Sequence, residues 1–164
     1  MQYIPWILNF RFDGYSATRV DMSDNGGICL NWKFTNIDAN FSVPVDWEAL
    51  RHYALAVKRQ RDGTQHLVCE LSGEFNSGGL HAVRRIDFSD GCRWLARLQR
   101  EGPTPESCQR LLHEVHTMAV VRAISAIPVP EAFSYEASCD HAVGVAFMLV
   151  EFIPGDTATD SFGG

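Results

Sequence analysis

The fold is decided by the stretch Leu80-His-Ala-Val-Arg-Arg-Ile-Asp-Phe-Ser-Asp-Gly-Cys-Arg-Trp-Leu95, which continues into Ala96-Arg97-Leu98. It predicts two strands joined by a turn at Ser89-Asp90-Gly91, because Asp-Gly between alternating apolar residues is a strong hairpin signal. Side chains alternate along a strand, so Leu95 and Arg97 lie on the same face of the second strand. The stretch therefore predicts an antiparallel hairpin that carries a cation near its end.

A helix is predicted after this hairpin, over residues 105–124. Thr104 is a favourable N-cap, and Pro105 suits the first helical position. The run Ile127-Pro-Val-Pro130 ends the helix, because residues that precede proline favour an extended backbone. One helix is therefore expected between the hairpin and the strands that follow it.

One acidic residue of this helix, Glu114, is expected on its apolar face. At about 100° per residue it falls beside Met118, whereas His113 and His116 fall on the opposite side. A carboxylate on a packed face needs a partner, because stranding it costs on the order of several kcal/mol. Arg97 is the nearest cation that the hairpin supplies. Two interpretations stay open: the pair presents the guanidinium to nucleotide phosphates, or it is an ordinary ion pair that braces helix against sheet.

The remaining patterns predict an α+β domain. A leading helix is expected from Asp46, which can cap its N-terminus, to Gly63, which can end it. Further strands are expected near residues 67–72, 132–135 and 146–152, and short turns join neighbouring strands in antiparallel fashion. The expected domain is a five-stranded antiparallel sheet with one packed helix, preceded by the leading helix.

The domain organisation follows from these elements. Residues 1–45 are expected to be a partly ordered N-terminal extension with one short hairpin. Residues 46–155 form the folded domain. Residues 156–164 are interpreted as a linker, because the strand pattern ends at Pro154-Gly155.

Glycines gather between the first two predicted strands. The loop Gly73-Glu-Phe-Asn-Ser-Gly-Gly79 contains Gly73, Ser77, Gly78 and Gly79. Such a loop can bring backbone amides close to an anion, and it can equally be an ordinary hairpin connection. It gains significance only because the strand with Arg97 follows it.

The composition describes a globular, acidic chain. Hydrophobic residues make up 46% and the formal net charge is −6, which argues against a nucleic-acid groove with its basic surface. The five cysteines have no C-x-x-C spacing, as is typical of free thiols in a reducing compartment. We find no signal peptide and no run of about 18 apolar residues. A cytoplasmic chain without a membrane or nucleic-acid partner is expected.

Several motifs together resemble the aminoglycoside-phosphotransferase/choline-kinase-like family, especially its fungal members. They are, in order, residues 78–97, Glu114-Val-His-Thr-Met118, Ile127-Pro-Val-Pro130 and Leu149-Val-Glu-Phe-Ile-Pro-Gly155. The resemblance covers roughly residues 46–164. It implies a protein-kinase-like fold with a small N-terminal lobe, a hinge and a larger helical lobe. It also implies transfer of the γ-phosphoryl group of ATP, with Mg²⁺, to a hydroxyl of a small-molecule acceptor.

The resemblance assigns the phosphate contacts to two parts of the chain. Arg97 takes the place of the strand lysine that contacts the α- and β-phosphates, and Glu114 is its helix partner. Residues 73–79 would form the loop that covers the phosphates. This loop lacks the regular G-x-G-x-x-G spacing.

The resemblance assigns the adenine contacts to four further residues. Leu95 would lie over the adenine ring, and Val150 would lie at the back of its pocket. The Glu151 carbonyl and the Ile153 amide would pair with the edge of the adenine. The implied nucleotide site thus comprises ten residues: Gly73, Ser77, Gly78, Gly79, Leu95, Arg97, Glu114, Val150, Glu151 and Ile153.

The catalytic loop of the family, which resembles H-G-D-x-x-x-x-N, does not occur among these residues. None of the six histidines begins such a motif. We therefore predict no catalytic and no metal-binding residue here, and expect both kinds in a larger lobe after Gly164. The chain alone is expected to be an inactive ATP-binding N-lobe. The alternative is a non-catalytic interaction or regulatory module that retains only the shape of the lobe.

Two weaker expectations complete the analysis. The underside of a kinase N-lobe faces the other lobe, so Leu95 and Val150 are expected in an exposed apolar patch that favours self-association. The run His113-Glu-Val-His116 leaves a weak metal site open, although it is one residue short of the zinc motif H-E-x-x-H. Histidines in contact with solvent fit this run better.

Overall fold

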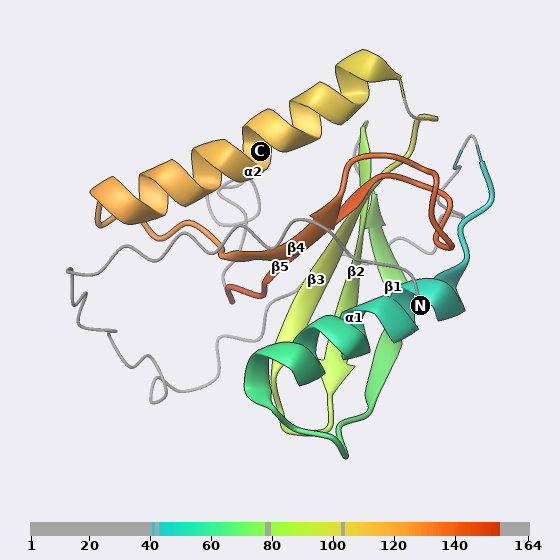
Figure 1. The fold of residues 1–164 in the computed structure, drawn as a ribbon, viewed down its shortest axis with the longest axis vertical. Helices are drawn as coiled ribbons and strands as arrows, with labels where there is room; N and C mark the ends of the chain where they lie inside the picture. The colour runs from blue at the N-terminus through green and yellow to red at the C-terminus, as the bar shows by residue number, and fades with distance from the viewer. Residues whose placement is uncertain (1–40, 42, 78–79, 103, 155–164) are drawn as a thin grey trace, which may run out of the picture.

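The computed structural model describes residues 41, 43–77, 80–102 and 104–154. They form two helices and one five-stranded sheet in the order β1-β2-β3-β5-β4, with every neighbouring pair antiparallel (Figure 1). The helices are α1 (Trp47–Asp62) and α2 (Pro105–Ile124), and the strands are β1 (Cys69–Ser77), β2 (His81–Phe88), β3 (Arg93–Gln99), β4 (Ala132–Glu136) and β5 (Phe147–Glu151). The predicted α+β class and antiparallel sheet are confirmed. The extension over residues 1–40 and the linker over 156–164 lie outside the described residues.

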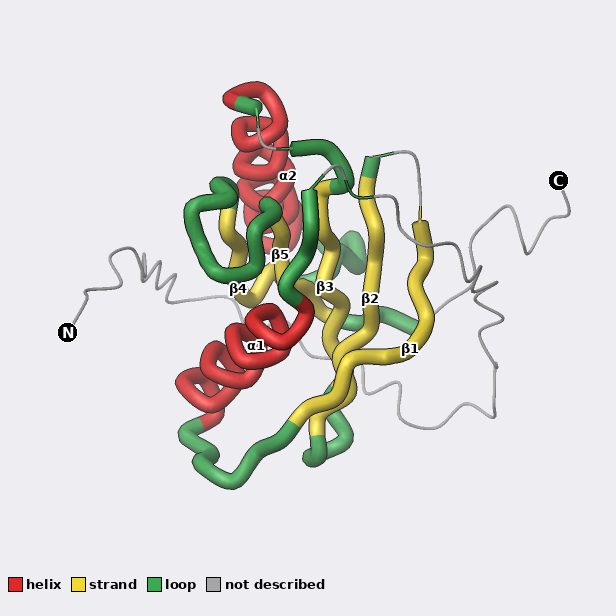
Figure 2. The backbone as a smooth tube through the Cα atoms, turned by 90° about the vertical axis from the view of Figure 1, so that its right-hand side faces the viewer, coloured by secondary structure: helices red, strands yellow, loops and turns green. Residues whose placement is uncertain are grey.

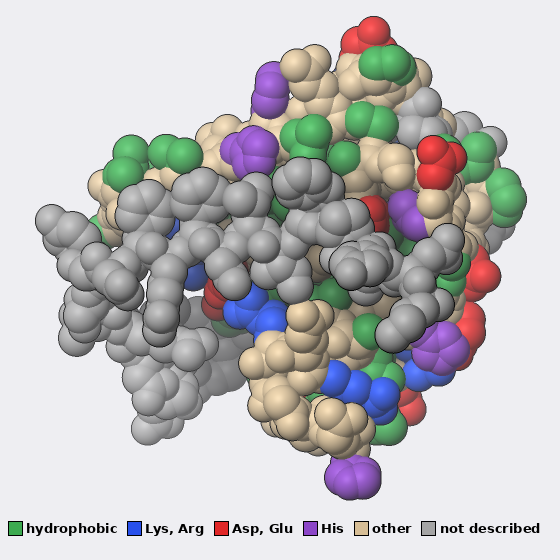
Figure 3. Space-filling model, in the orientation of Figure 1, with side chains coloured by type: hydrophobic (Ala, Val, Ile, Leu, Met, Phe, Trp, Pro, Cys, Tyr) green, Lys and Arg blue, Asp and Glu red, His purple; other side chains and the backbone are tan. Residues whose placement is uncertain are grey.

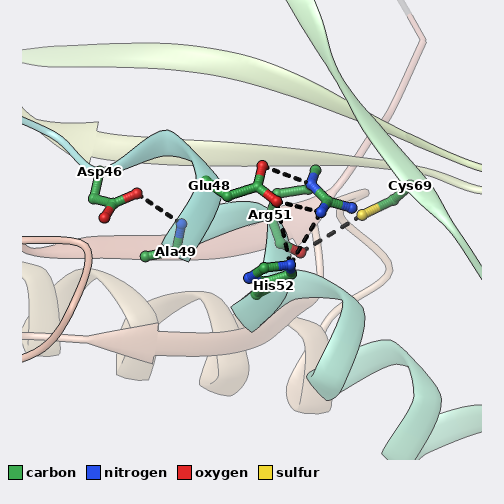
Figure 4. Close-up of polar contacts among 6 residues, drawn as sticks. All are labelled: Asp46, Glu48, Ala49, Arg51, His52 and Cys69. Atoms are coloured by element: carbon green, nitrogen blue, oxygen red, sulfur yellow. Dashed lines mark hydrogen bonds and ion pairs between the residues drawn. The ribbon is translucent and has the colours of Figure 1, made fainter.

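Both helices begin where their capping residues predict. In α1 the Asp46 carboxylate accepts a hydrogen bond from Ala49 N at 2.9 Å (Figure 4). Gly63 ends this helix with a left-handed φ of 69°. In α2 the Thr104 side chain accepts from Ser107 N, and the Ser107 hydroxyl accepts from Thr104 N, which forms a capping box. These caps satisfy amides that the first turn of a helix leaves unpaired.

A short polar cluster lies on the first two turns of α1 (Figure 4). Glu48 pairs with Arg51 and with His52 one turn further along the helix. The Cys69 thiol of β1 donates to the Arg51 carbonyl at 3.6 Å. Pairs spaced in this way on a helix surface contribute only a few tenths of a kcal/mol, roughly. We therefore interpret the cluster as support for α1.

The Asp-Gly turn fixes the register of the central hairpin. Gly91 adopts a φ of 84°, which glycine tolerates, and the Gly91 amide donates to the Phe88 carbonyl. Val83 consequently lies opposite Arg97, and His81 lies opposite Gln99. The predicted hairpin is confirmed, and its register determines which side chains of β2 and of β3 lie on the same face of the sheet.

The two helices lie on opposite faces of the sheet (Figure 2), and each contributes to a separate apolar cluster. Along β5, Phe147 and Leu149 pack in the cluster that contains α1, whereas Met148 and Val150 pack in the cluster that contains α2. Alternation along the strand therefore assigns α1 to one face and α2 to the other. The leading helix is thus a second packed helix, in addition to the one predicted.

The glycine-rich loop is shorter than predicted. Residues 73–77 belong to β1, which pairs with β2 from Phe75 to Ser77 after a register shift between Leu71 and Phe75. The interpretation of 73–77 as loop is therefore wrong. A register shift of this kind accommodates an irregular strand segment around Gly73 within the pairing.

Lys58, in the last turns of α1, is buried with 3% of its surface exposed. Its ammonium group contacts Asp62 at 2.5 Å and Asp90 of the β2–β3 turn at 2.9 Å. It also lies over the rings of Phe88 and Trp94. Burial lowers the pKa of Lys58, but the hydrogen bonds to the two carboxylates raise it more, and the net shift is upward.

Candidate functional site

The predicted partners Arg97 and Glu114 meet between β3 and α2. The Arg97 guanidinium forms an ion pair with the Glu114 carboxylate through Nη1. Each side chain is about one-third exposed, at 31% and 32% respectively. The pair therefore lies at the edge of the interface between α2 and the sheet, where the guanidinium is also in contact with solvent. Burial lowers the pKa of the Arg97 guanidinium from its ordinary value.

A histidine from the neighbouring strand joins this pair. Arg97 Nη2 lies 3.2 Å from Nδ1 of His81, the first residue of β2. Burial, together with the charges of Arg97 and of Arg110 on α2, lowers the pKa of His81 to about 4. The ring is therefore neutral at pH 7. Three elements, β2, β3 and α2, thus supply one cluster, which we call the Arg97 cluster: His81, Arg97 and Glu114.

A small polar pocket adjoins the Arg97 cluster at the start of α2. Its lining is made by Leu80, His81, Gln99, Glu101, Ser107 and Arg110. The Leu80 carbonyl accepts from Arg100 N, so the residue just before β2 meets the end of β3 here. This end of the sheet therefore brings together Leu80, the end of β3 and the first turns of α2.

The predicted adenine contacts Leu95 and Val150 lie side by side on the face that carries Arg97. They are paired across β3 and β5, and both pack with Leu111 and Val115 of α2. Val150 is only 7% exposed and Leu95 is partly buried. The expected exposed patch at these two residues is therefore wrong, because α2 covers Val150 and packs against Leu95, which stays only partly exposed.

The other predicted site residues fall into two groups. Glu151 ends β5, where its carboxylate accepts from Glu131 N and contacts Arg122, and Ile153 is exposed just beyond it. Gly73 and Ser77 lie in β1, and Gly78 and Gly79 lie outside the described residues. The structure thus brings together Leu95, Arg97, Glu114 and Val150. Glu151 lies at the end of β5, one residue beyond Val150.

No metal centre is found in the part of the chain that the structure describes. Nowhere in these ranges do three or more His, Cys, Asp or Glu side chains converge as ligands. His113 and His116 are exposed on α2, as the helical pattern predicts.

Neither of the two described helices is long and apolar enough to cross a membrane.

The sequence analysis missed His81 as a member of the site. The signal was present, because the turn at Asp90-Gly91 fixes the hairpin register. That register sets His81 opposite Gln99 and diagonal to Arg97 on the same face. Arg110, by contrast, was missed because its place depends on how α2 lies on the sheet.

We expect the Arg97–Glu114 pair to contribute measurably to stability. A double-mutant cycle of Arg97→Met and Glu114→Gln should give a coupling free energy of about 1 kcal/mol in urea unfolding, because the pair is partly shielded from water. The matched control is Arg61–Glu131, an ion pair at 3.0 Å with more exposed side chains (42% and 38%). Its coupling should be smaller, and a larger value there than at Arg97 would contradict the expectation.

Comparison with known proteins gives sparse results. No protein-family model and no solved structure matches the chain. Two subtelomeric hrmA-associated cluster proteins, from two strains of Aspergillus fumigatus, are each 29% identical to it over 92 residues. The match covers 54% of this chain and 17% of each relative. The chain therefore corresponds to about a sixth of the length of these relatives.

Proposed function

We propose that residues 46–155 are the nucleotide-binding N-lobe of a small-molecule phosphotransferase with a protein-kinase-like fold. The proposed family is that of aminoglycoside phosphotransferases and choline kinases, and the proposed ligand is ATP with Mg²⁺. The observation that carries the proposal is the ion pair between Arg97 of β3 and Glu114 of α2, next to Leu95 and Val150. A cation held from the sheet by a helix carboxylate is the arrangement that kinases use at the α- and β-phosphates.

The role proposed for these residues is to bind and orient the nucleotide. Arg97 would contact phosphate oxygens with guanidinium donors that Glu114 leaves available, since arginine has five N–H donors. Leu95 would contact the adenine ring, and the backbone beyond β5 would pair with its edge. The aspartate base, the Mg²⁺ ligands and the selection of the acceptor are assigned to residues outside this chain.

A thermal-shift titration with Mg²⁺–ATP tests the proposal. At ten times the dissociation constant, binding should stabilise the wild-type chain by about 1.4 kcal/mol, which raises the melting temperature by several degrees. Arg97→Ala should weaken binding about ten-fold or more, because it removes a charge-assisted contact to phosphate.

The matched control for this titration is Arg61→Ala. It also removes one guanidinium and one ion pair, with Glu131, but Arg61 contacts Phe133, which packs in the α1 cluster. Arg61→Ala should therefore keep the wild-type shift with nucleotide. A wild-type chain that shows no shift with Mg²⁺–ATP would overturn the proposed function.

A second candidate function, a non-catalytic interaction module, is favoured by one observation. Hydrophobic side chains gather at the C-terminal end of α2, at the left of Figure 3. Val120, Ile124 and the following Ile127 are 54%, 79% and 62% exposed. Exposed apolar surface of this kind is typical of binding surfaces. Absence of the nucleotide shift would leave this candidate as the better one.

A further inference from the structure

The contact between Arg97 and His81 fixes the tautomer of the histidine. A guanidinium carries only N–H donors, so the ring nitrogen that faces it must accept. That nitrogen is Nδ1, at 3.2 Å from Arg97 Nη2. The neutral ring therefore holds its proton on Nε2. A doubly protonated ring has no acceptor and cannot keep this hydrogen bond.

The surroundings of His81 favour this neutral state. Arg97 acts on the ring from β3 and Arg110 acts on it from α2, and both charges oppose protonation. The Glu101 carboxylate lines the same pocket with the opposite charge. Burial, Arg97 and Arg110 lower the pKa of His81 to about 4.

The opposite strand supplies a buried acceptor that lines the same pocket as His81. Gln99 lies directly across from His81 and is 5% exposed. Its amide nitrogen donates to the Ser107 carbonyl at 2.8 Å, which fixes the amide orientation. The Gln99 Oε1 atom is buried without a hydrogen-bond partner among the described residues, and Gln99 lines the same pocket as His81. The pocket beside His81 therefore contains an acceptor that no described side chain or amide uses.

Two contacts hold the guanidinium plane of Arg97, each on a different terminal nitrogen. Glu114 of α2 binds Nη1 and His81 of β2 contacts Nη2. One ion pair leaves a planar group free to rotate about the contact, whereas two contacts on separate atoms define the plane. Neither contact involves Nε of Arg97.

We propose that His81 is a positioning residue, which together with Glu114 orients Arg97 so that its remaining donors face the phosphates of a bound nucleotide. This inference rests on the proposed function of the same site. His81 acts through Arg97 and need not touch the nucleotide. The chemical requirement is an acceptor at the place of Nδ1, and a positive charge on the ring is not required.

Substitutions that separate shape from acceptor chemistry test this role. His81→Leu keeps an apolar side chain of similar size without an acceptor, and should weaken Mg²⁺–ATP binding about ten-fold, the effect of one hydrogen bond to a charged group. His81→Asn places a carbonyl oxygen near the position of Nδ1, and should bind within about two-fold of wild type. His113→Leu, on the exposed face of α2, is the control and should bind as wild type does. Equal loss in both His81 variants, or none in His81→Leu, would overturn the proposal.

Nitrogen NMR of the imidazole ring gives a readout that needs no nucleotide. In the wild-type chain His81 should be the Nε2–H tautomer and should titrate near pH 4. In Arg97→Leu its pKa should rise towards the ordinary value of about 6.5, because one opposing charge is gone. An Nδ1–H tautomer, or a pKa that Arg97→Leu leaves unchanged, would overturn the positioning role. If the wild-type chain shows no Mg²⁺–ATP shift, the proposed function fails, while the ring measurements still decide whether His81 holds Arg97.

Discussion

Lys58→Ala is expected to destabilise the domain by about 3 kcal/mol in urea unfolding followed by circular dichroism. The substitution removes a buried ammonium that joins the end of α1 to the β2–β3 turn through Asp62 and Asp90. It also removes the contacts of the ammonium group with the rings of Phe88 and Trp94 and the buried aliphatic stem that carries this group. Small domains have a total stability of about 5–15 kcal/mol, so this loss is a large fraction of it.

Two further variants serve as controls, one for the packing of the Lys58 side chain and one for an exposed position of the same helix. Lys58→Met keeps the buried stem and should lose about half as much stability as Lys58→Ala. Gln60→Ala, at an exposed position of the same helix, should change stability by less than about 0.5 kcal/mol. A Lys58→Ala variant that unfolds at the wild-type urea concentration would contradict the buried role.

The stability difference between wild type and Lys58→Ala is expected to decrease at low pH. Burial raises the pKa of Asp90, but hydrogen bonds from Lys58 and from Cys92 N lower it more, and the net shift is downward. A carboxylate with a depressed folded-state pKa stabilises the fold above its unfolded pKa, about 3.9, and loses this effect as the pH falls through the folded value. The stability gap between wild type and Lys58→Ala should therefore narrow below about pH 4.

Phe147→Ala is expected to cost about 3–5 kcal/mol, because it opens a cavity in the core. Phe147 is fully buried in β5, between β3 and β4. Its ring meets Tyr53 of α1 edge-on at a centroid distance of 5.1 Å and His141 at 5.5 Å. One side chain thus joins the helix, the central sheet and the loop before β5.

The measurement for Phe147→Ala is the shift in the urea midpoint at unchanged slope. Tyr135→Ala on the neighbouring strand β4 is the control, since Tyr135 is 37% exposed and should contribute less than about 1 kcal/mol. Equal effects at the two aromatic positions would contradict the assignment of Phe147 to the centre of the core.

Local signals predicted most of the fold. The Asp46 and Thr104 caps, the Gly63 stop and the Asp90-Gly91 turn act over a few residues, and each element boundary that depends on them is confirmed. The Arg97–Glu114 contact was also predictable, because it follows from one helical angle and one strand alternation. These features need no knowledge of the distant parts of the chain.

The features that were missed depend on contacts between distant segments. Gly73 suggested a loop, but pairing with β2 extends β1 through this region. The partners of the buried Lys58 depend on such a contact too, since the β2–β3 turn brings Asp90 to the end of α1. Val150 is covered only because α2 lies across its face of the sheet. Local propensity cannot supply this information, since tertiary packing decides it.

The strand order has a consequence for how the chain reaches its final form during synthesis. Among the five described strands β5 is the last to leave the ribosome, yet it lies between β3 and β4. A nascent chain that has reached Glu136 can join β1, β2 and β3, but β4 then has no neighbour with which to pair. The Asp46 amide at the start of α1 likewise awaits the Val143 carbonyl. Because β5 contributes side chains to the apolar clusters on both faces of the sheet, we expect neither cluster to be complete before β5 has been synthesised.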